Sequence, residues 1–345
     1  MKPIVTVLTP VYNGLPYLID SIESILSQSY KEFDYLIIDD ASPDKKVVDC
    51  IKSFQDSRIK FVRNDENLGV CNTMNKALSM ISTKYVIRQD HDDVSLPNRI
   101  EEQVDFLENH SEISIICSWE HTIDENNRRG RNWKSEINNY GEFLAPTLLG
   151  ICPIWHPSIA FRTKAMKDVG GFRKEFTRAE DFEVTTRLAL ERHGASILKK
   201  YHLLQRQHNQ RQSKEFEGEQ VKISNLIQEN ALSSFNNNFK QLAPFLRLEI
   251  SKKDNLSFKE YKIFMYKLLL ELFDTVKEKK KMSQKEADSF KKVIYRRLGF
   301  GVFFMPYFNF LPSFLFRLLF YLLSPFYFKR LYRLLSNLFN FIYKI

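Results

Sequence analysis

The chain has 345 residues, of which 43% are hydrophobic and 27% charged, a composition typical of a globular protein with a buried core. With only 11 glycines and 12 prolines, it is neither fibrous nor dominated by linkers. Its four cysteines form no CxxC pair, which favours buried thiols in a reducing compartment over a disulfide framework or a zinc site.

The positive charge is concentrated in the last third of the chain. Residues 1–213 contain 28 Lys and Arg against 30 Asp and Glu, whereas residues 214–345 contain 23 against 12. The second segment therefore has a net charge of +11, while the first is nearly neutral. A basic segment binds polyanions, which leaves nucleic acid and anionic lipid as candidate partners.

The first 90 residues alternate between strand and helix patterns. Short apolar, β-branched runs predict strands, and apolar residues at helical spacing predict helices between them. In chain order the strands are expected at 4–9, 33–38, 59–62 and 85–87, and the helices at 17–28, 45–54 and 70–82. This alternation predicts an α/β fold with a Rossmann-like, mostly parallel sheet flanked by helices, in which ligands collect beyond the carboxyl ends of the strands.

The pattern becomes irregular after residue 110. Strands are expected at 113–117 and 158–162, a loop or hairpin at 120–133, and helices at 143–150 and 180–192. Residues 214–297 are rich in Lys and Glu and have apolar positions at helical spacing, which predicts a helical region. We therefore divide the chain into an α/β domain (1–213), a helical region (214–297) and a hydrophobic, basic segment (298–345).

The hydrophobic, basic segment has the pattern of a membrane-associating region. Between residues 300 and 328 the only charge is Arg317, but three prolines divide this stretch into pieces too short to span a bilayer. From 328 to 345, basic and polar side chains share one helical face and Leu, Phe and Ile the other, as in a helix lying in a membrane interface. The alternative is that residues 300–328 pack on the helical region as ordinary core. The start of the chain has no signal-peptide pattern, so we expect the protein at the cytoplasmic face of the inner (plasma) membrane.

The strongest candidate site is the acidic run Asp90-His91-Asp92-Asp93, which follows the fourth predicted strand. Adjacent carboxylates repel one another, and a cation that prefers oxygen ligands, Mg²⁺ or Mn²⁺, relieves the repulsion. Such an ion keeps open positions for a diphosphate. The alternative is a solvated acidic turn.

Other candidate residues lie at the ends of other predicted elements. Asp39 ends the second strand, where a carboxylate can accept a hydrogen bond from a nucleobase or ribose, or can stabilise a turn. Glu180 and Asp181 begin a helix, where either can act as a general base or can favour the helix dipole. His156 and His208 are weaker candidates for an acceptor or phosphate contact. No GxxxxGK[ST] or GxGxxG loop is present, so a bound nucleotide would be held by metal and side chains.

Five motifs in this order resemble the family 2 glycosyltransferases of the GT-A fold. The resemblance covers about residues 3–213 and rests on Ile4 to Asn13, Leu26 to Tyr30, Ile38 to Asp44, Asn67-Leu68-Gly69 with Asn75, and Asp90 to Asp93 with Pro97. It implies that the α/β domain is a GT-A catalytic domain that binds a nucleotide-sugar donor.

The resemblance also implies a role for each candidate residue. Asp90 and Asp92 match the metal-binding DxD motif, in which Asp92 would ligate the cation that bridges the diphosphate. Asp181 matches the catalytic base, the second acid of an ED motif that Glu180 begins. His156 resembles a histidine that often precedes this motif. The nucleotide-sugar-binding residues would be Thr9, Val11, Tyr12, Asp39, Asn67 and Asp90, with Asp39 favouring a UDP-sugar.

The implied reaction is an inverting transfer of a hexosyl or N-acetylhexosaminyl group to a hydroxyl of a glycan or lipid-linked acceptor, as in surface polysaccharide synthesis. Asp181 would remove the acceptor proton, and Mn²⁺ or Mg²⁺ would offset charge on the departing diphosphate. The chain lacks the QxxRW motif of processive synthases, so we expect a non-processive enzyme that adds one or a few sugars. The basic, aromatic tail fits an anionic membrane surface rather than nucleic acid. The alternative function is a catalytically inactive, membrane-bound scaffold with the same fold.

Overall fold

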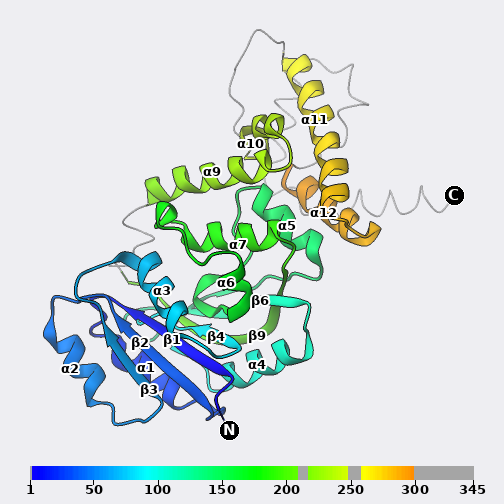
Figure 1. Cartoon of the computed structure of the whole chain (residues 1–345). Helices are drawn as coiled ribbons and strands as arrows, with labels where there is room; N and C mark the ends of the chain where they lie inside the picture. The colour runs from blue at the N-terminus through cyan, green and yellow to red at the C-terminus, as the bar shows by residue number, and fades with distance from the viewer. Residues whose placement is uncertain (1, 209–216, 248–257, 299–345) are drawn as a thin grey trace.

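The structure is a computed structural model that describes residues 2–208, 217–247 and 258–298 (Figure 1). The strand–helix alternation predicted for the first 90 residues is present with small shifts of the element ends. The elements are β1 (Val5–Val11), α1 (Leu18–Leu26), β2 (Phe33–Asp39), α2 (Lys45–Ser53), β3 (Ile59–Arg63), α3 (Gly69–Met80) and β4 (Tyr85–Arg88).

The next 120 residues contain longer strands than the sequence predicted. They form β5 (Val94–Ser95), α4 (Arg99–Asn109), β6 (Ile113–Ile123), β7 (Arg129–Trp133), α5 (Tyr140–Leu148), the 3-10 helix η1 (His156–Ser158), β8 (Ala160–Arg162), α6 (Thr163–Asp168), η2 (Lys174–Phe176), α7 (Glu180–Leu190) and β9 (Gly194–Arg206). Strands β6 and β7 form the hairpin expected at 120–133, and β9 was not predicted.

All nine strands belong to one mixed sheet with the order β3-β2-β1-β4-β8-β6-β9-β5, to which β7 is added on β6. Strands β3, β2, β1 and β4 are parallel, as predicted. The expectation of a mostly parallel sheet is wrong for the other half, where β6 and β9 alone run parallel. The β6–β7 hairpin reverses the chain and α5 then carries it across, so β8 enters the sheet opposite in direction to β6.

Both faces of the sheet are buried beneath helices. Alternate residues of each strand point to opposite faces and so contact different cores. On β2, Tyr35 and Ile37 contact one core with the apolar sides of α1, α2 and α4, whereas Leu36 and Ile38 contact the other. Helices α3, α5 and α7 cover this second face (Figure 1). The packing leaves the carboxyl ends of β1, β2 and β4 together at one edge of the sheet.

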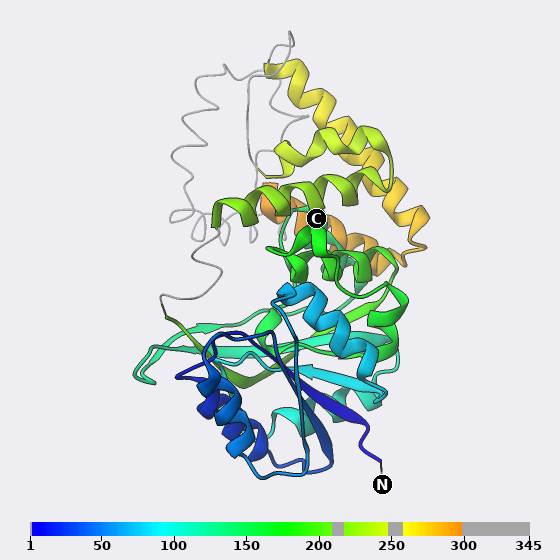
Figure 2. The same ribbon diagram turned by 60° about the vertical axis from the view of Figure 1, so that its left-hand side comes forward.

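The region predicted to be helical consists of α9 (Glu217–Ser233), η3 (Asn237–Gln241), α10 (Leu242–Leu246), α11 (Phe258–Lys279) and α12 (Gln284–Leu298). These helices pack against α5 and α7, on the side away from β1–β3 (Figures 1 and 2). Leu232, Leu269 and Phe290 belong to the same continuous core as Phe143 and Leu188. The helical region is therefore packed onto the α/β domain through a shared core.

The proposed membrane segment, 298–345, falls almost entirely outside the described residues, as do residues 209–213 of the α/β domain. Within the described ranges, no helix combines the length and the apolar character that a bilayer crossing requires.

Candidate active site

The carboxyl end of β2 carries two aspartates with different surroundings. Asp39 is fully buried, and its carboxylate accepts hydrogen bonds from the Ser42 hydroxyl and the Arg63 guanidinium. Asp40 accepts instead from the backbone amides of Leu68 and Gly69, both at 2.9 Å, at the start of α3. Asp40 therefore fixes the loop, whereas Asp39 presents a carboxylate that is covered by one partly exposed arginine.

The residues expected around the nucleotide lie at this edge of the sheet, but their side chains differ in how far they are exposed to solvent. Thr9 and Val11 are buried, and the Thr9 hydroxyl is 3.2 Å from that of Tyr35. Tyr12 is 41% exposed. The Asn67 side chain is exposed, and its oxygen accepts from the Gly69 amide at 3.0 Å. Of the residues expected around the nucleotide, Tyr12, Asn67 and the partly exposed Asp90 can therefore offer side-chain atoms to a ligand in this conformation.

Asp90 is held by an arginine that the sequence analysis did not single out. Arg88, at the end of β4, donates from Nε to Asp90 at 2.7 Å and from Nη1 to His156 Nε2 at 2.7 Å. Because His156 accepts this bond, its Nε2 carries no proton. Burial, with the Arg88 charge, lowers the pKa of His156 well below its usual value. Arg88 thus connects the acidic run to the histidine on η1.

Asp92 contacts the second candidate histidine, 116 residues later in the chain. The Asp92 carboxylate and His208 Nε2 lie 2.9 Å apart at the end of β9. This is the length of a hydrogen bond between the two side chains, and it brings together one carboxylate and one imidazole, groups that can both ligate Mn²⁺. Among the described residues, no group of three or more His, Cys, Asp or Glu side chains forms a complete metal site. Donor oxygens and water would have to fill the other positions.

The third acid of the run, Asp93, is buried, and its pKa is raised well above the usual value by burial and by the charges of Asp92 and Asp90. It accepts a hydrogen bond from the Arg206 amide at 2.9 Å. The buried Arg206 guanidinium donates to the Asp92 carbonyl at 3.0 Å and to Asp20 of α1 at 2.9 Å. The acidic side chains are thus clustered at this loop, and the buried guanidinium of Arg206 bonds to its backbone.

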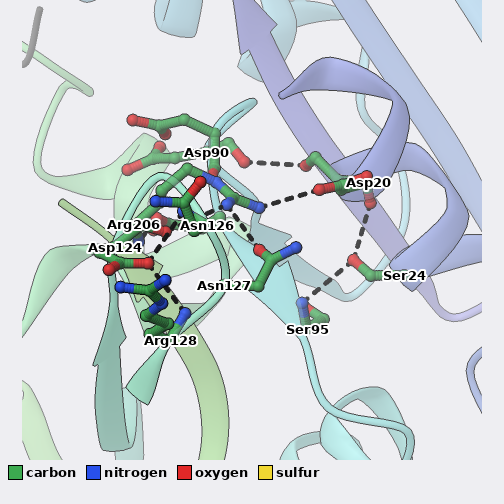
Figure 3. Close-up of polar contacts among 12 residues, drawn as sticks. Asp20, Ser24, Asp90, Ser95, Asp124, Asn126, Asn127, Arg128 and Arg206 are labelled. Atoms are coloured by element: carbon green, nitrogen blue, oxygen red, sulfur yellow. Dashed lines mark hydrogen bonds and ion pairs between the residues drawn. The ribbon is translucent and has the colours of Figure 1, made fainter. Parts of the chain in front are cut away.

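Arg206 also reaches the tip of the β6–β7 hairpin, where it donates to Asn127 Oδ1 at 2.6 Å (Figure 3). The tip itself is tightly bent. Asn127 has a φ of 62°, and Asp124 accepts from the amides of Asn126 and Arg128 at 2.8 and 2.9 Å. The hairpin, the acidic loop and α1 are therefore joined through the same guanidinium.

Glu180 and Asp181 form the first turn of α7, as predicted. Burial raises the pKa of both carboxyls, and the charge of Asp181 adds to the rise at Glu180, against the effect of Arg88. Asp181 lines the large cavity described next, and Glu180 is not among its lining residues. The geometry therefore favours Asp181 over Glu180 as the group that meets a ligand.

A cavity of about 1030 Å³ brings these elements together. Its lining includes Asp90, His156 and Asp181 together with residues of the β6–β7 hairpin. The buried Glu120 also lines it, and burial raises the pKa of this carboxyl to about 8. Trp133 and Trp155 stack at 4.9 Å between ring centroids at the same wall. A cavity whose lining includes two acids with raised pKa values, Glu120 and Asp181, together with Asp90 and two aromatic rings, can bind a polar molecule and accept a proton from it.

Three residues of this arrangement were not recognised in the sequence: Arg88, Glu120 and Arg206. Arg88 directly precedes the acidic run, so its place at the end of a strand was the available signal. Glu120 and Arg206 carry no such signal, because they reach the site through β6 and β9, whose pairing joins distant parts of the chain.

Comparisons with known proteins agree with this architecture. The profile of the family described as "Glycosyl transferase family 2" matches residues 6–170. An uncharacterized glycosyltransferase of Methanocaldococcus jannaschii is 32% identical over 203 residues, which are 58% of this chain and 69% of the relative. The putative glycosyltransferase EpsE of Bacillus subtilis is 33% identical over 54% of this chain and 66% of its own length. The solved structure of S. aureus TarS 1–349 in complex with UDP-GlcNAc has a similar fold, with a TM-score of 0.57 at 19% identity over 85% of this chain and 90% of that one.

Proposed function

Because the chain belongs to glycosyl transferase family 2, we propose that it transfers a sugar from a nucleotide-sugar donor, specifically a UDP-sugar, to a hydroxyl group of a glycan or lipid-linked acceptor. The transferred group in this proposal is a hexosyl or N-acetylhexosaminyl unit, and one or a few are added per acceptor. The observation that carries the proposal is the cavity in which Asp181, with a raised pKa, shares the wall with Asp90. The UDP-GlcNAc bound in the TarS structure, which has a similar fold, supports a nucleotide-sugar donor.

The proposed reaction is a single displacement with inversion. Asp181 accepts the proton of the acceptor hydroxyl as its oxygen attacks the anomeric carbon, and the bond to the diphosphate breaks. The raised pKa makes the carboxylate a stronger base than an exposed aspartate. Arg88 holds Asp90 in place, and Glu180 acts through its charge on the neighbouring base.

Asp92 and His208 are the residues we propose to hold Mn²⁺ or Mg²⁺. Such an ion offsets negative charge on a departing diphosphate. The clustered carboxylates of Asp90, Asp92 and Asp93 supply the charge that a cation would neutralise, and this is reflected in the raised pKa of Asp93. At the other end of the site, Tyr12 and Asn67 would contact the nucleotide, and a base N–H would reach Asp39 once Arg63 turns outward.

The test is nucleotide release from a panel of nucleotide sugars, with and without Mn²⁺ or Mg²⁺, for the wild type and for Asp92→Ala and Asp181→Asn. We expect slow hydrolysis of one donor, dependent on metal and lost in both variants. Asp168→Asn, which changes an exposed carboxylate paired with Lys164 on α6, is the matched control and should behave as wild type. If calorimetry then shows that no member of the panel binds, the inactive scaffold replaces this proposal.

We also propose that residues 298–345 bring the enzyme to an anionic membrane surface at the cytoplasmic face of the inner membrane. The support is the sequence pattern of that segment, a low-charge stretch followed by a basic amphipathic helix pattern. Co-sedimentation with vesicles containing anionic lipid should be strong for the full chain and weak for a chain that ends at residue 298. Equal binding by both chains would contradict the proposal.

A further inference from the structure

Resting on the proposed sugar transfer, we propose that the acceptor carries an acidic group, phosphoryl or carboxylate, next to the accepting hydroxyl, and that Arg129 and Arg131 of β7 bind it. The two arginines belong to the β6–β7 hairpin, and both line the cavity that Asp90 and Asp181 also line. The hairpin extends outward from the sheet (Figure 2). A ligand that fills this cavity therefore contacts Asp181 and the hairpin together.

Both arginines line the cavity. Trp133 pairs with Glu120 across the strands and stacks on Trp155, and all three line the cavity as well. The pairing of β6 with β7 shifts between Asn132 and Arg129, where β7 has one extra residue. The cavity lining, and not the alternation of the strand, therefore places Arg129 and Arg131 beside Trp133.

The lysine next to the hairpin lies elsewhere. Lys134 is 4.7 Å from the Trp119 ring and does not line the cavity. Asn132, which does line it, accepts a hydrogen bond at Oδ1 from His121 Nδ1 at 2.6 Å, and His121 stacks on Tyr201 at 3.8 Å between centroids. The positive charge that the hairpin gives to the cavity therefore comes from its arginines.

Neither cavity-side arginine is neutralised within the part of the chain that the structure describes. No carboxylate of the described residues lies within ion-pair distance of Arg129 or Arg131, whereas the buried Arg88 and Arg206 each have one. The nearest acid at the hairpin tip, Asp124, is engaged by backbone amides. A guanidinium binds phosphate or carboxylate through paired, charge-assisted hydrogen bonds, so these two side chains are suited to an acidic group.

The hairpin that carries the arginines is connected to the acidic loop. The Arg206 guanidinium bonds Asn127 of the hairpin tip, the Asp92 carbonyl and Asp20 together (Figure 3). The stacked rings of Trp133 and Trp155 line the same cavity, where they offer an apolar surface to a sugar ring. The cavity therefore combines an apolar surface for a ring with positive charge for an acidic group.

The experiment measures binding and donor hydrolysis in parallel. Three fluorescent probes of similar length are used: a neutral oligosaccharide, an oligosaccharide containing uronic acid, and a glycan linked through phosphodiesters. Each is titrated against the full-length wild type, Arg129→Gln/Arg131→Gln, and the control Lys134→Gln/Lys199→Gln. The control removes the same two charges from side chains that do not line the cavity.

We expect one acidic probe to bind the wild type at least 10-fold more tightly than the neutral probe, with affinity that falls as salt is raised. The class that binds identifies the acidic group as carboxylate or phosphoryl. The arginine variant should lose about 10- to 100-fold in affinity for it, and the lysine control less than 2-fold. Donor hydrolysis without acceptor should be unchanged in the lysine control.

Three results would overturn the inference: equal binding of neutral and acidic probes, no binding of either acidic probe, or wild-type affinity in the arginine variant. A raised KM for the donor in the arginine variant would place the two arginines at the donor diphosphate instead. If the wild type hydrolyses no donor, that result contradicts the proposed function but not this inference, because probe binding is measured without turnover.

Discussion

At the scale of single residues, Glu120 is a carboxyl group that the fold holds away from water. It is 1% exposed, and among the described residues neither of its oxygens has a hydrogen-bond partner within bonding distance. Burial raises its pKa to about 8, although Ser158 and the Arg99 charge act in the opposite direction. At neutral pH the folded protein therefore contains Glu120 mainly in its uncharged form.

This raised pKa makes stability depend on pH in a specific way. The pKa of Glu120 in the folded protein lies above its unfolded value of about 4.3, so Glu120 binds its proton more tightly in the folded state. Its contribution to the free energy of unfolding is therefore fully present below about pH 4.3 and is lost as pH rises through about 8. Glu120→Gln cannot ionise, so it should lie close to the wild type at pH 5 and exceed it by a few kcal/mol at pH 9. The reason is that each pH unit between the unfolded and folded pKa values costs the wild type about 1.4 kcal/mol. Urea unfolding at the two pH values measures this. Glu125→Gln, on the exposed hairpin tip, should show no such dependence.

The base proposed for the reaction gives a second prediction. Asp181 must be deprotonated to act, and burial raises its pKa, so kcat/KM should fall on the acid side with a midpoint above the usual value of about 3.9. The charges of Asp181 and Glu180 repel each other, so Glu180→Gln should move this midpoint to lower pH. A pH profile whose acid limb stays in place in Glu180→Gln would contradict the assignment.

At the scale of elements, α5 and α12 approach so closely that a glycine is needed between them. A Cβ on Gly141 would lie 2.0 Å from the Glu286 carbonyl oxygen. Gly141→Ala should therefore lower the free energy of unfolding by about 1–3 kcal/mol through overpacking. Gly218→Ala in α9, where a Cβ meets nothing within 4 Å, is the control and should be neutral or slightly stabilising. Thermal unfolding of the two variants decides the point.

The predictable elements are those built from local patterns. Strands β1, β2 and β4 are buried on both faces, so they read as continuous apolar runs, and the helices between them have one apolar side. Strand β9 was missed because its 13 residues include Lys199, Lys200 and His202 and lack the apolar run of a central strand. Its place is set by pairing with β6, about 80 residues earlier, which no local pattern encodes.

The candidate site also separates into locally and distantly encoded parts. Asp39, Asp90 and Asp92 were proposed because they follow predicted strands and lie in motifs on which the family resemblance rests. The contact of Asp92 with His208 depends on where β9 ends, and that of Arg88 with His156 on how η1 packs. The arginines of β7 were visible only as part of an unassigned hairpin. Their proposed role requires knowledge of which hairpin residues line the cavity.

At the scale of the whole molecule, the helical region is part of the same folding unit as the sheet. One core extends from Leu8 and Ile38 of the sheet through Phe143 and Leu188 to Phe273 of α11. The three-part division of the sequence therefore does not correspond to three independent cores in the described residues.

A chain that ends at residue 208 should consequently fail to fold stably. It would expose the buried sides of α5 and α7, including Phe143, Leu144 and Leu188, to water. We expect it to aggregate or to lose cooperative unfolding, as measured by gel filtration and circular dichroism. A chain ending at residue 298 keeps every described contact and should unfold cooperatively. A stable, monomeric chain of residues 1–208 would show that the shared core is dispensable.

The Arg206 contacts have a consequence for the order of events during turnover. One buried guanidinium bonds the loop that carries the proposed cation ligand and the hairpin that carries the proposed acceptor-binding arginines. If donor binding shifted the loop, the hairpin bonded to Arg206 would shift with it. A ligand bound at the hairpin would then change the affinity for the donor by the same coupling free energy. The two substrates would then bind cooperatively, and Arg206→Lys should uncouple them while leaving each half of the cavity in place.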